Sequence, residues 1–126
     1  MARILVVDDE KETVGLVHFI LERDGHTVVP FYDGQTLLDR VHSEQPDLIV
    51  LDIMMPGMDG YTVCTRLAAD EQVRGVPILI LTAKGDMRDV FQWSGNIASY
   101  MQKPFNPSVL RAQVKKILAE RAGGQT

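Results

Sequence analysis

The chain of 126 residues has very little cysteine, because Cys64 is the only one. A single cysteine cannot form a disulfide within the chain, so a reducing compartment is the simpler expectation. Long apolar runs are also lacking, and none approaches the roughly 20 residues that a membrane-spanning helix needs. No signal peptide precedes the first apolar run, Ile4–Val7. These absences predict a soluble, cytoplasmic protein without a membrane partner.

Basic residues are not in excess, since 13 Lys and Arg stand against 17 Asp and Glu, for a net charge of -4. A nucleic-acid surface normally shows as a basic excess, so we predict no direct nucleic-acid binding by this chain. The three histidines, His18, His26 and His42, lack the spacing of zinc ligands. The length and the absence of repeats predict one domain over residues 1–122, with residues 123–126 as a flexible tail or the start of a linker.

Short apolar runs alternate with amphipathic segments along the chain. Helical spacing of apolar residues predicts a helix after each apolar run, and the fourth helix, around Met87–Ser94, is short. This alternation predicts an α/β fold, a single doubly wound five-stranded parallel sheet with five helices and the flavodoxin-like strand order 2-1-3-4-5. The predicted strands are Ile4–Val7, Thr27–Phe31, Leu48–Leu51, Ile78–Leu81 and Tyr100–Gln102.

Polar side chains stand where the predicted strands end. Asp8 and Asp9 follow the first strand, and Asp52, Thr82 and Lys103 follow the third, fourth and fifth. The carboxyl ends of parallel strands meet at one edge of the sheet, where ligands bind. Three carboxylates in one pocket repel one another unless a cation is present, and hard oxygen ligands suit Mg²⁺. A carboxylate can also attack phosphorus, with a metal and a lysine neutralising the developing charge.

Each of these residues also has a structural interpretation. An acid or a threonine at a strand end often caps the following helix, and a lone lysine is usually a solvated surface residue. The coincidence of all five at one edge favours a phosphoryl-transfer site over five unrelated structural roles.

Four stretches carry a resemblance to a known family: Ile4–Glu10, Pro46–Gly60, Leu81–Lys84 and Lys103–Phe105. With them the chain resembles the receiver domains of two-component response regulators over nearly its whole length. The resemblance implies a phosphoacceptor switch in a phosphorelay, which catalyses only its own phosphotransfer and slow autodephosphorylation. It also implies a sensor histidine kinase or a phosphotransfer protein as donor, and a downstream protein or a fused output domain as target.

The resemblance implies a role for each residue of the acidic cluster. Asp52 would accept the phosphoryl group from a phosphohistidine. Asp9, Asp52 and the backbone carbonyl of Met54 would hold Mg²⁺ directly, and Asp8 would act largely through a metal-bound water.

The remaining implied roles belong to the phosphoryl contacts and the switch. Lys103 would pair with one phosphoryl oxygen, and the Thr82 hydroxyl would bond another. Tyr100 would turn inward as Thr82 moves, and the face built from the fourth helix, the fifth strand and the last helix would carry the output. The Lys103–Pro104 peptide bond is expected to be cis. Met54 and Lys84 either tune the lifetime of the phosphate or are ordinary loop residues.

The match is weakest before the fifth strand. Asn96–Tyr100 replaces a pattern common in the family, which predicts a distorted or mobile fourth helix. Many DNA-binding members dimerise through charged residues on this face, so we do not expect that mode of pairing here. The positions that would carry those charges are Ala98, Ser99, Val109 and Gln113.

Other functions are weaker on the residues themselves. A phosphatase with an aspartate nucleophile needs a second acid two residues later, but Met54 stands there after Asp52, and Glu10 after Asp8 is a poor match. A flavin-binding protein of this topology would need a phosphate-cradling loop where Asp8 and Asp9 stand. An interaction module with an unused pocket is the remaining alternative, and the intact set of site residues argues against it.

Overall fold

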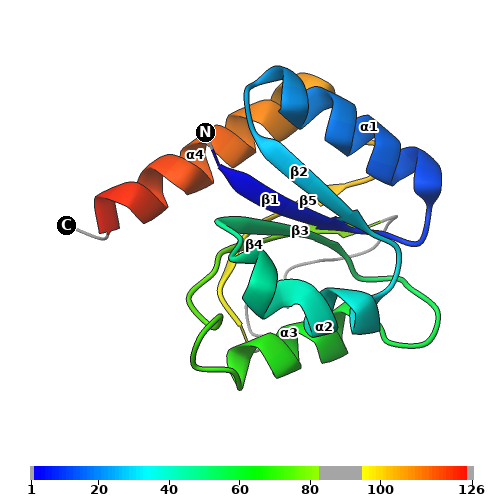
Figure 1. Cartoon of the computed structure of the whole chain (residues 1–126). Coiled ribbons are helices and arrows are strands. Elements are labelled where there is room, and N and C mark those ends of the chain that lie inside the picture. Colours follow the sequence, from blue (N-terminus) through cyan, green and yellow to red (C-terminus); the bar gives the residue numbers. More distant parts are fainter. Residues whose placement is uncertain (1, 83–94, 125–126) are drawn as a thin grey trace.

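The computed structural model describes residues 2–82 and 95–124 (Figure 1). Within them the strands pair in parallel in one sheet of order β2-β1-β3-β4-β5, which confirms the predicted α/β class and strand order. The predicted helix around Met87–Ser94 lies outside the described residues. The elements are β1 (Arg3–Val7), α1 (Lys11–Arg23), β2 (Thr27–Phe31), α2 (Gly34–Glu44), β3 (Leu48–Asp52), α3 (Gly60–Ala68), β4 (Ile78–Thr82), β5 (Ile97–Gln102) and α4 (Pro107–Gly124).

Helices cover both faces of the sheet: α1 and α4 lie on one side, and α2 and α3 on the other (Figure 1). Side chains of a strand alternate between the two faces, so β1 contributes to two separate cores. Leu5 and Val7 belong to the core under α2 and α3, whereas Ile4 and Val6 belong to the core under α1 and α4. Because both faces are buried, β3 and β4 are apolar up to their last residues, which are Asp52 and Thr82. Cys64 lies in the first core, where burial raises the pKa of its thiol to about 12.

Short polar side chains begin three of the helices. Asp33 accepts a hydrogen bond from the Thr36 N–H at 2.7 Å, and Asp59 accepts one from the Thr62 N–H at 2.8 Å. Asn106 accepts one from the Ser108 N–H at 2.7 Å before α4, and proline is the first helical residue. Asp33 and Asp59 follow strands, as the site acids do, but their carboxylates are used as helix caps.

A glycine sets the position of the loop that follows β3. A Cβ atom at Gly60 would lie 2.6 Å from the Ile53 Cα and 3.0 Å from the Asp52 carbonyl oxygen. Only glycine therefore allows α3 to begin against the end of β3. The Gly60 N–H donates to the Ile53 carbonyl at 3.1 Å, which closes the loop beside Asp52.

Strand β5 is longer than predicted, since it begins at Ile97 and not at Tyr100. Its first half carries little apolar signal because it is an edge strand, and its residues alternate between partial burial and exposure. Asn96 aligns it: the carbonyl oxygen accepts from the Ile78 N–H at 2.8 Å, and the side-chain amide donates to the Gly75 carbonyl at 2.9 Å.

Candidate functional site

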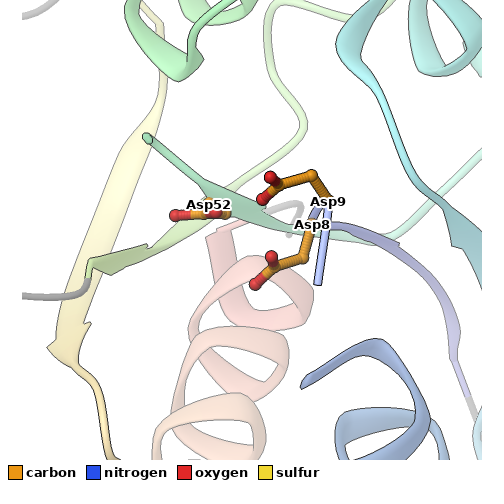
Figure 2. A group of neighbouring side chains, drawn as sticks. All are labelled: Asp8, Asp9 and Asp52. Atoms are coloured by element: carbon orange, nitrogen blue, oxygen red, sulfur yellow. The ribbon is translucent and has the colours of Figure 1, made fainter. Parts of the chain in front are cut away.

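The carboxyl ends of β1 and β3 bring three carboxylates together (Figure 2). Asp8 and Asp9 follow β1 directly, and Asp52 is the last residue of β3, which is the neighbouring strand. One oxygen from each carboxylate lies within 4.8 Å of the others. Asp8 and Asp52 are buried, at 0% and 2% exposure, whereas Asp9 is exposed. The predicted acidic cluster is therefore present, and Asp9 is its solvent-facing member.

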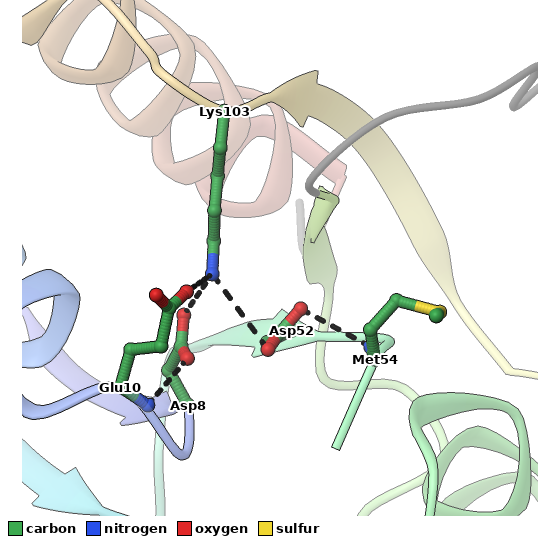
Figure 3. A network of polar contacts seen from close by, with 5 residues as sticks. All are labelled: Asp8, Glu10, Asp52, Met54 and Lys103. Atoms are coloured by element: carbon green, nitrogen blue, oxygen red, sulfur yellow. Dashed lines mark hydrogen bonds and ion pairs between the residues drawn. The ribbon is translucent and has the colours of Figure 1, made fainter.

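Lys103 follows β5 and points its ammonium group into this cluster (Figure 3). The Lys103 Nζ lies 2.7 Å from Asp8 Oδ2 and 2.9 Å from Glu10 Oε1, which are hydrogen-bond distances. It lies 3.7 Å from Asp52 Oδ2, which is an ion pair without a hydrogen bond. The Lys103 backbone N–H donates to the Thr82 carbonyl at 2.6 Å, so the last residue of β4 holds the backbone from which the Lys103 side chain extends.

Backbone amides orient the two buried carboxylates. The Met54 N–H donates to Asp52 Oδ1 at 3.1 Å, and the Glu10 N–H donates to Asp8 Oδ1 at 2.9 Å (Figure 3). The Asp8 N–H in turn donates to the Phe31 carbonyl at 3.2 Å, which ties the loop to the end of β2. Each buried carboxylate thus has one oxygen held by a backbone N–H and its other oxygen directed toward Lys103.

The charges of the site are not balanced. Burial raises the pKa of Asp52 to about 7; the Asp8 carboxylate acts in the same direction, while the Met54 N–H and Lys103 oppose it. Burial by itself lowers the pKa of Lys103, but its hydrogen bonds to Asp8 and Glu10 outweigh burial, so the pKa of Lys103 is raised and the group stays charged. Several carboxylates therefore share one ammonium group.

A divalent cation bound at this cluster would offset the imbalance. Three carboxylates supply hard oxygen donors, and the exposure of Asp9 leaves room for the waters that Mg²⁺ retains. The residues present therefore fit Mg²⁺, and the cluster of Asp8, Asp9 and Asp52 is able to hold a metal ion.

The other predicted residues lie on the neighbouring strands. Thr82 is fully buried at the end of β4, one residue beyond Leu81, which pairs with Asp52. Tyr100 is on β5, two residues before the partner of Thr82, and is 39% exposed. The Lys103–Pro104 peptide bond is cis, as the resemblance implied. Lys84 lies outside the described residues.

Glu10 belongs to the site, although no role was predicted for it. It stands in the loop before α1 and lies on the far side of Lys103 from Asp52 (Figure 3). The available signal was its place two residues after Asp8 in a run of three acids. Its contact with a lysine 93 residues later depends on the closure of the sheet, which no local pattern encodes.

The fold and this acidic cluster together are typical of the signalling switches of two-component systems. The chain belongs to the response regulator receiver domain family, because the model of that family matches residues 4–115.

Curated relatives support the same assignment. The chain is 45% identical over 117 residues to the alkaline phosphatase synthesis transcriptional regulatory protein PhoP of Bacillus subtilis (strain 168), which covers 92% of this chain and 48% of that protein. It is 41% identical over 114 residues to the DNA-binding response regulator MtrA of Mycolicibacterium smegmatis, covering 90% and 49%. The chain spans about half the length of the curated relatives it matches.

Solved structures agree in fold. The signal receiver domain of a signal transduction histidine kinase from Syntrophus aciditrophicus superposes with a TM-score of 0.85 at 30% identity, covering 95% of this chain and 92% of that one. The chemotaxis response regulator CheY4 of Vibrio cholerae superposes with a TM-score of 0.84 at 28% identity, covering 93% and 98%.

The relatives correct the prediction about nucleic acid. We predicted from the net charge of -4 that this chain does not bind nucleic acid directly, but MtrA, whose sequence matches this chain, is a DNA-binding response regulator. The prediction was wrong because charge was summed over a segment that spans only half of such proteins. The acidity of a receiver segment therefore does not bear on whether the protein class binds DNA. Among the described residues, no helix has the length and apolar character to cross a membrane.

Proposed function

We propose that this receiver domain is a phosphorylation switch in which Asp52 accepts a phosphoryl group from a phosphohistidine donor protein. The observation that carries the proposal is the surroundings of Asp52. Its buried carboxylate has the Lys103 ammonium 3.7 Å away and two further acids whose oxygens lie within 4.8 Å. A structural acid at a strand end needs neither a lysine nor two other carboxylates, as the helix caps Asp33 and Asp59 illustrate.

The chemistry is a transfer between two nucleophiles. A carboxylate oxygen of Asp52 attacks the phosphorus, the P–N bond to the histidine breaks, and the imidazole nitrogen leaves with the electron pair. The product is an acyl phosphate on Asp52. Lys103 donates to a phosphoryl oxygen from the side on which it now faces Asp52 Oδ2, and the Thr82 hydroxyl donates to another.

Asp9, Asp52 and the backbone carbonyl of Met54 would hold Mg²⁺ directly, with Asp8 acting through a metal-bound water. When bound, the metal supplies positive charge that offsets the phosphoryl oxygens and the carboxylates. The chain's own residues arrange for this: the two backbone N–H bonds to Asp8 and Asp52 leave their other oxygens toward the shared pocket.

The same site acts as the switch. A phosphoryl group on Asp52 adds contacts to Thr82 and Lys103 that favour one arrangement of β4 and β5. Tyr100, half-exposed on β5, follows Thr82 inward, and the surface of β5 and α4 changes for the target. The phosphate is lost by slow hydrolysis at the same site. The domain thus catalyses only its own phosphorylation and dephosphorylation. We place the domain at residues 1–122, in keeping with the family match to residues 4–115.

The test is the intact mass of the protein after incubation with Mg²⁺ and acetyl phosphate. We expect one added phosphoryl group, which is absent without Mg²⁺ and absent in Asp52→Asn. Asp59→Asn is a matched control, because Asp59 is an acid at the same edge whose carboxylate caps α3. It should be phosphorylated like the wild type. Incorporation that survives Asp52→Asn, or that needs no metal, would contradict the proposal.

A further inference from the structure

Lys103 is shared between a buried acid and an exposed one. Its ammonium group is nearly buried, at 13% exposure of the side chain, and Asp8 on its inner side is wholly buried. Glu10 approaches it from the solvent side, with 62% of its side chain exposed, at 2.9 Å (Figure 3). The ammonium group is therefore bound by a buried acid on one side and by a solvent-exposed acid on the other.

These two contacts hold the ammonium group on the Asp8 and Glu10 side of the pocket and leave one of its three donors for a phosphoryl group. An ammonium group has three donors, and Asp8 and Glu10 accept from it at 2.7 and 2.9 Å. Asp52 Oδ2, at 3.7 Å, lies beyond hydrogen-bond distance. Any movement of Lys103 toward Asp52 lengthens its contact with Glu10, which lies on the other side of the ammonium group (Figure 3).

We propose that Glu10 is a positioning residue that retains Lys103 in this resting position and thereby slows the phosphorylation of Asp52. The inference rests on the proposed function of Asp52 as acceptor, and it deepens that function by naming a residue that sets its rate. Glu10 does not touch the reacting atoms, so its effect passes through Lys103 alone.

The fold does not require the Glu10 side chain. Glu10 is the N-cap residue of α1, but its carboxylate makes no cap hydrogen bond to the first turn of the helix. Glu10 helps to position Asp8 through a hydrogen bond from its backbone N–H, and any residue other than proline would keep that donor. Among the described residues, Lys103 is the one hydrogen-bond and ion-pair partner of the Glu10 side chain, and substitution of Glu10 leaves the anchoring of Asp8 in place.

Three variants separate the contact from the charge. Glu10→Gln keeps the size and removes the charge, whereas Glu10→Asp keeps the charge and shortens the reach. An aspartate at an N-cap position also prefers to accept from the first-turn N–H groups, which turns it away from Lys103. Glu12→Gln is the matched control: Glu12 is an exposed acid in the first turn of α1, and its loss changes the net charge by the same amount.

The experiment measures the rate of phosphorylation with acetyl phosphate, extrapolated to a saturating donor concentration at saturating Mg²⁺. Ion pairs with one exposed partner shift equilibria by roughly two- to fivefold. We expect both Glu10 variants to raise the saturating rate by about that factor, while Glu12→Gln leaves it unchanged. A general relief of repulsion would instead lower the half-saturating donor concentration, and it would do so equally in Glu10→Gln and Glu12→Gln.

A second readout does not depend on phosphorylation. In metal-free protein labelled with ¹³C-lysine, the signal of the Lys103 ε-methylene should shift in both Glu10 variants and stay in place in Glu12→Gln. Rates in the Glu10 variants that equal or fall below the wild-type rate would overturn the inference. An effect of Glu10→Gln that Glu12→Gln reproduces would overturn it as well.

Failure of this inference and failure of the proposed function give different results. If wild type and all Glu10 variants gain one phosphoryl group that Asp52→Asn lacks, but at equal rates, only the role of Glu10 is lost. If no variant gains a phosphoryl group on Asp52, the acceptor assignment itself is wrong.

Discussion

At the amino ends of the strands, the buried acid Glu44 contacts two arginines, whereas at the carboxyl ends three acids share Lys103. Arg3 and Arg40 both donate to the Glu44 carboxylate, which is only 7% exposed. At the other edge, Asp8, Glu10 and Asp52 all face the Lys103 ammonium group, and Asp9 lies close to Asp8 and Asp52.

The two edges therefore differ in the direction of their pKa shifts. The hydrogen bond from Arg3, with the charges of both arginines, holds the pKa of Glu44 below its usual value in spite of burial. Burial and the nearby Asp8 raise the pKa of Asp52 to about 7. Ionisation of Glu44 therefore stabilises the folded state, whereas ionisation of Asp52 destabilises it.

The unfavourable charge of this fold therefore lies at the carboxyl ends of the strands. A buried acid with its own partners contributes to stability, whereas acids held together without enough cations are kept by the surrounding structure for another use. Stability measurements on the two edges can therefore distinguish a structural acid from a functional one before any phosphorylation is attempted.

The largest effect is expected for Asp52→Asn in metal-free protein. Because the folded pKa of Asp52 is raised, its stabilising influence is full below the unfolded value and is lost as pH rises through about 7. The penalty of the charge builds up between the unfolded value of 3.8 and about 7, at about 1.4 kcal/mol per pKa unit, so removing the charge should stabilise the fold by roughly 2–4 kcal/mol at pH 8, and by little at about pH 3.5. Urea unfolding at the two pH values measures this. Asp39→Asn, on the exposed face of α2, should change little at either pH.

Addition of Mg²⁺ should have a somewhat smaller effect of the same sign. A ligand at 100 times its dissociation constant stabilises the folded state by about 2.7 kcal/mol. We expect wild type and Glu44→Gln to gain equally from Mg²⁺ at pH 8, and Asp52→Asn to gain less, as measured by thermal unfolding with and without a chelator. Equal gains in all three proteins would place the metal outside the acidic cluster.

Glu44→Gln should destabilise the protein by about 1–3 kcal/mol at pH 7, because it leaves two arginines without their shared acceptor. The folded pKa of Glu44 is lowered, so its contribution is present above the unfolded value of 4.5 and is lost as pH falls through the folded value. Urea unfolding at pH 7 and below pH 4 should therefore show the difference shrinking with acidity. Glu120→Gln is the control, since Glu120 is exposed on α4. A difference that grows on acidification would be inconsistent with this account.

The smallest change in stability is expected for Asp33, an acid at the carboxyl ends of the strands whose role is to cap α2. Asp33→Ala removes the hydrogen bond to the Thr36 N–H and should cost about 1 kcal/mol of unfolding free energy. It should leave Mg²⁺ affinity unchanged in a calorimetric titration. A loss of Mg²⁺ affinity would extend the functional cluster beyond Asp8, Asp9 and Asp52.

Much of this arrangement follows from the sequence because its causes are local or periodic. Apolar runs such as Ile4–Val7 predict buried parallel strands, and the sheet rule then brings Asp8, Asp52 and Lys103 to one edge. The start of β5 at Ile97 was missed because an edge strand needs little apolar character. The Glu10–Lys103 contact was missed because it arises from tertiary closure alone. The nucleic-acid prediction failed because this chain matches only about half the length of its DNA-binding relatives, so its net charge says nothing about their other half.

The central claim is that Asp52 and no neighbouring acid receives the phosphoryl group. Borohydride converts an aspartyl phosphate into homoserine, so peptide mass mapping after phosphorylation and reduction names the modified position. We predict homoserine at position 52, formed only when Mg²⁺ was present. Homoserine at Asp8, Asp9 or Asp59, or at no position in protein that carries the phosphoryl mass, would contradict the account.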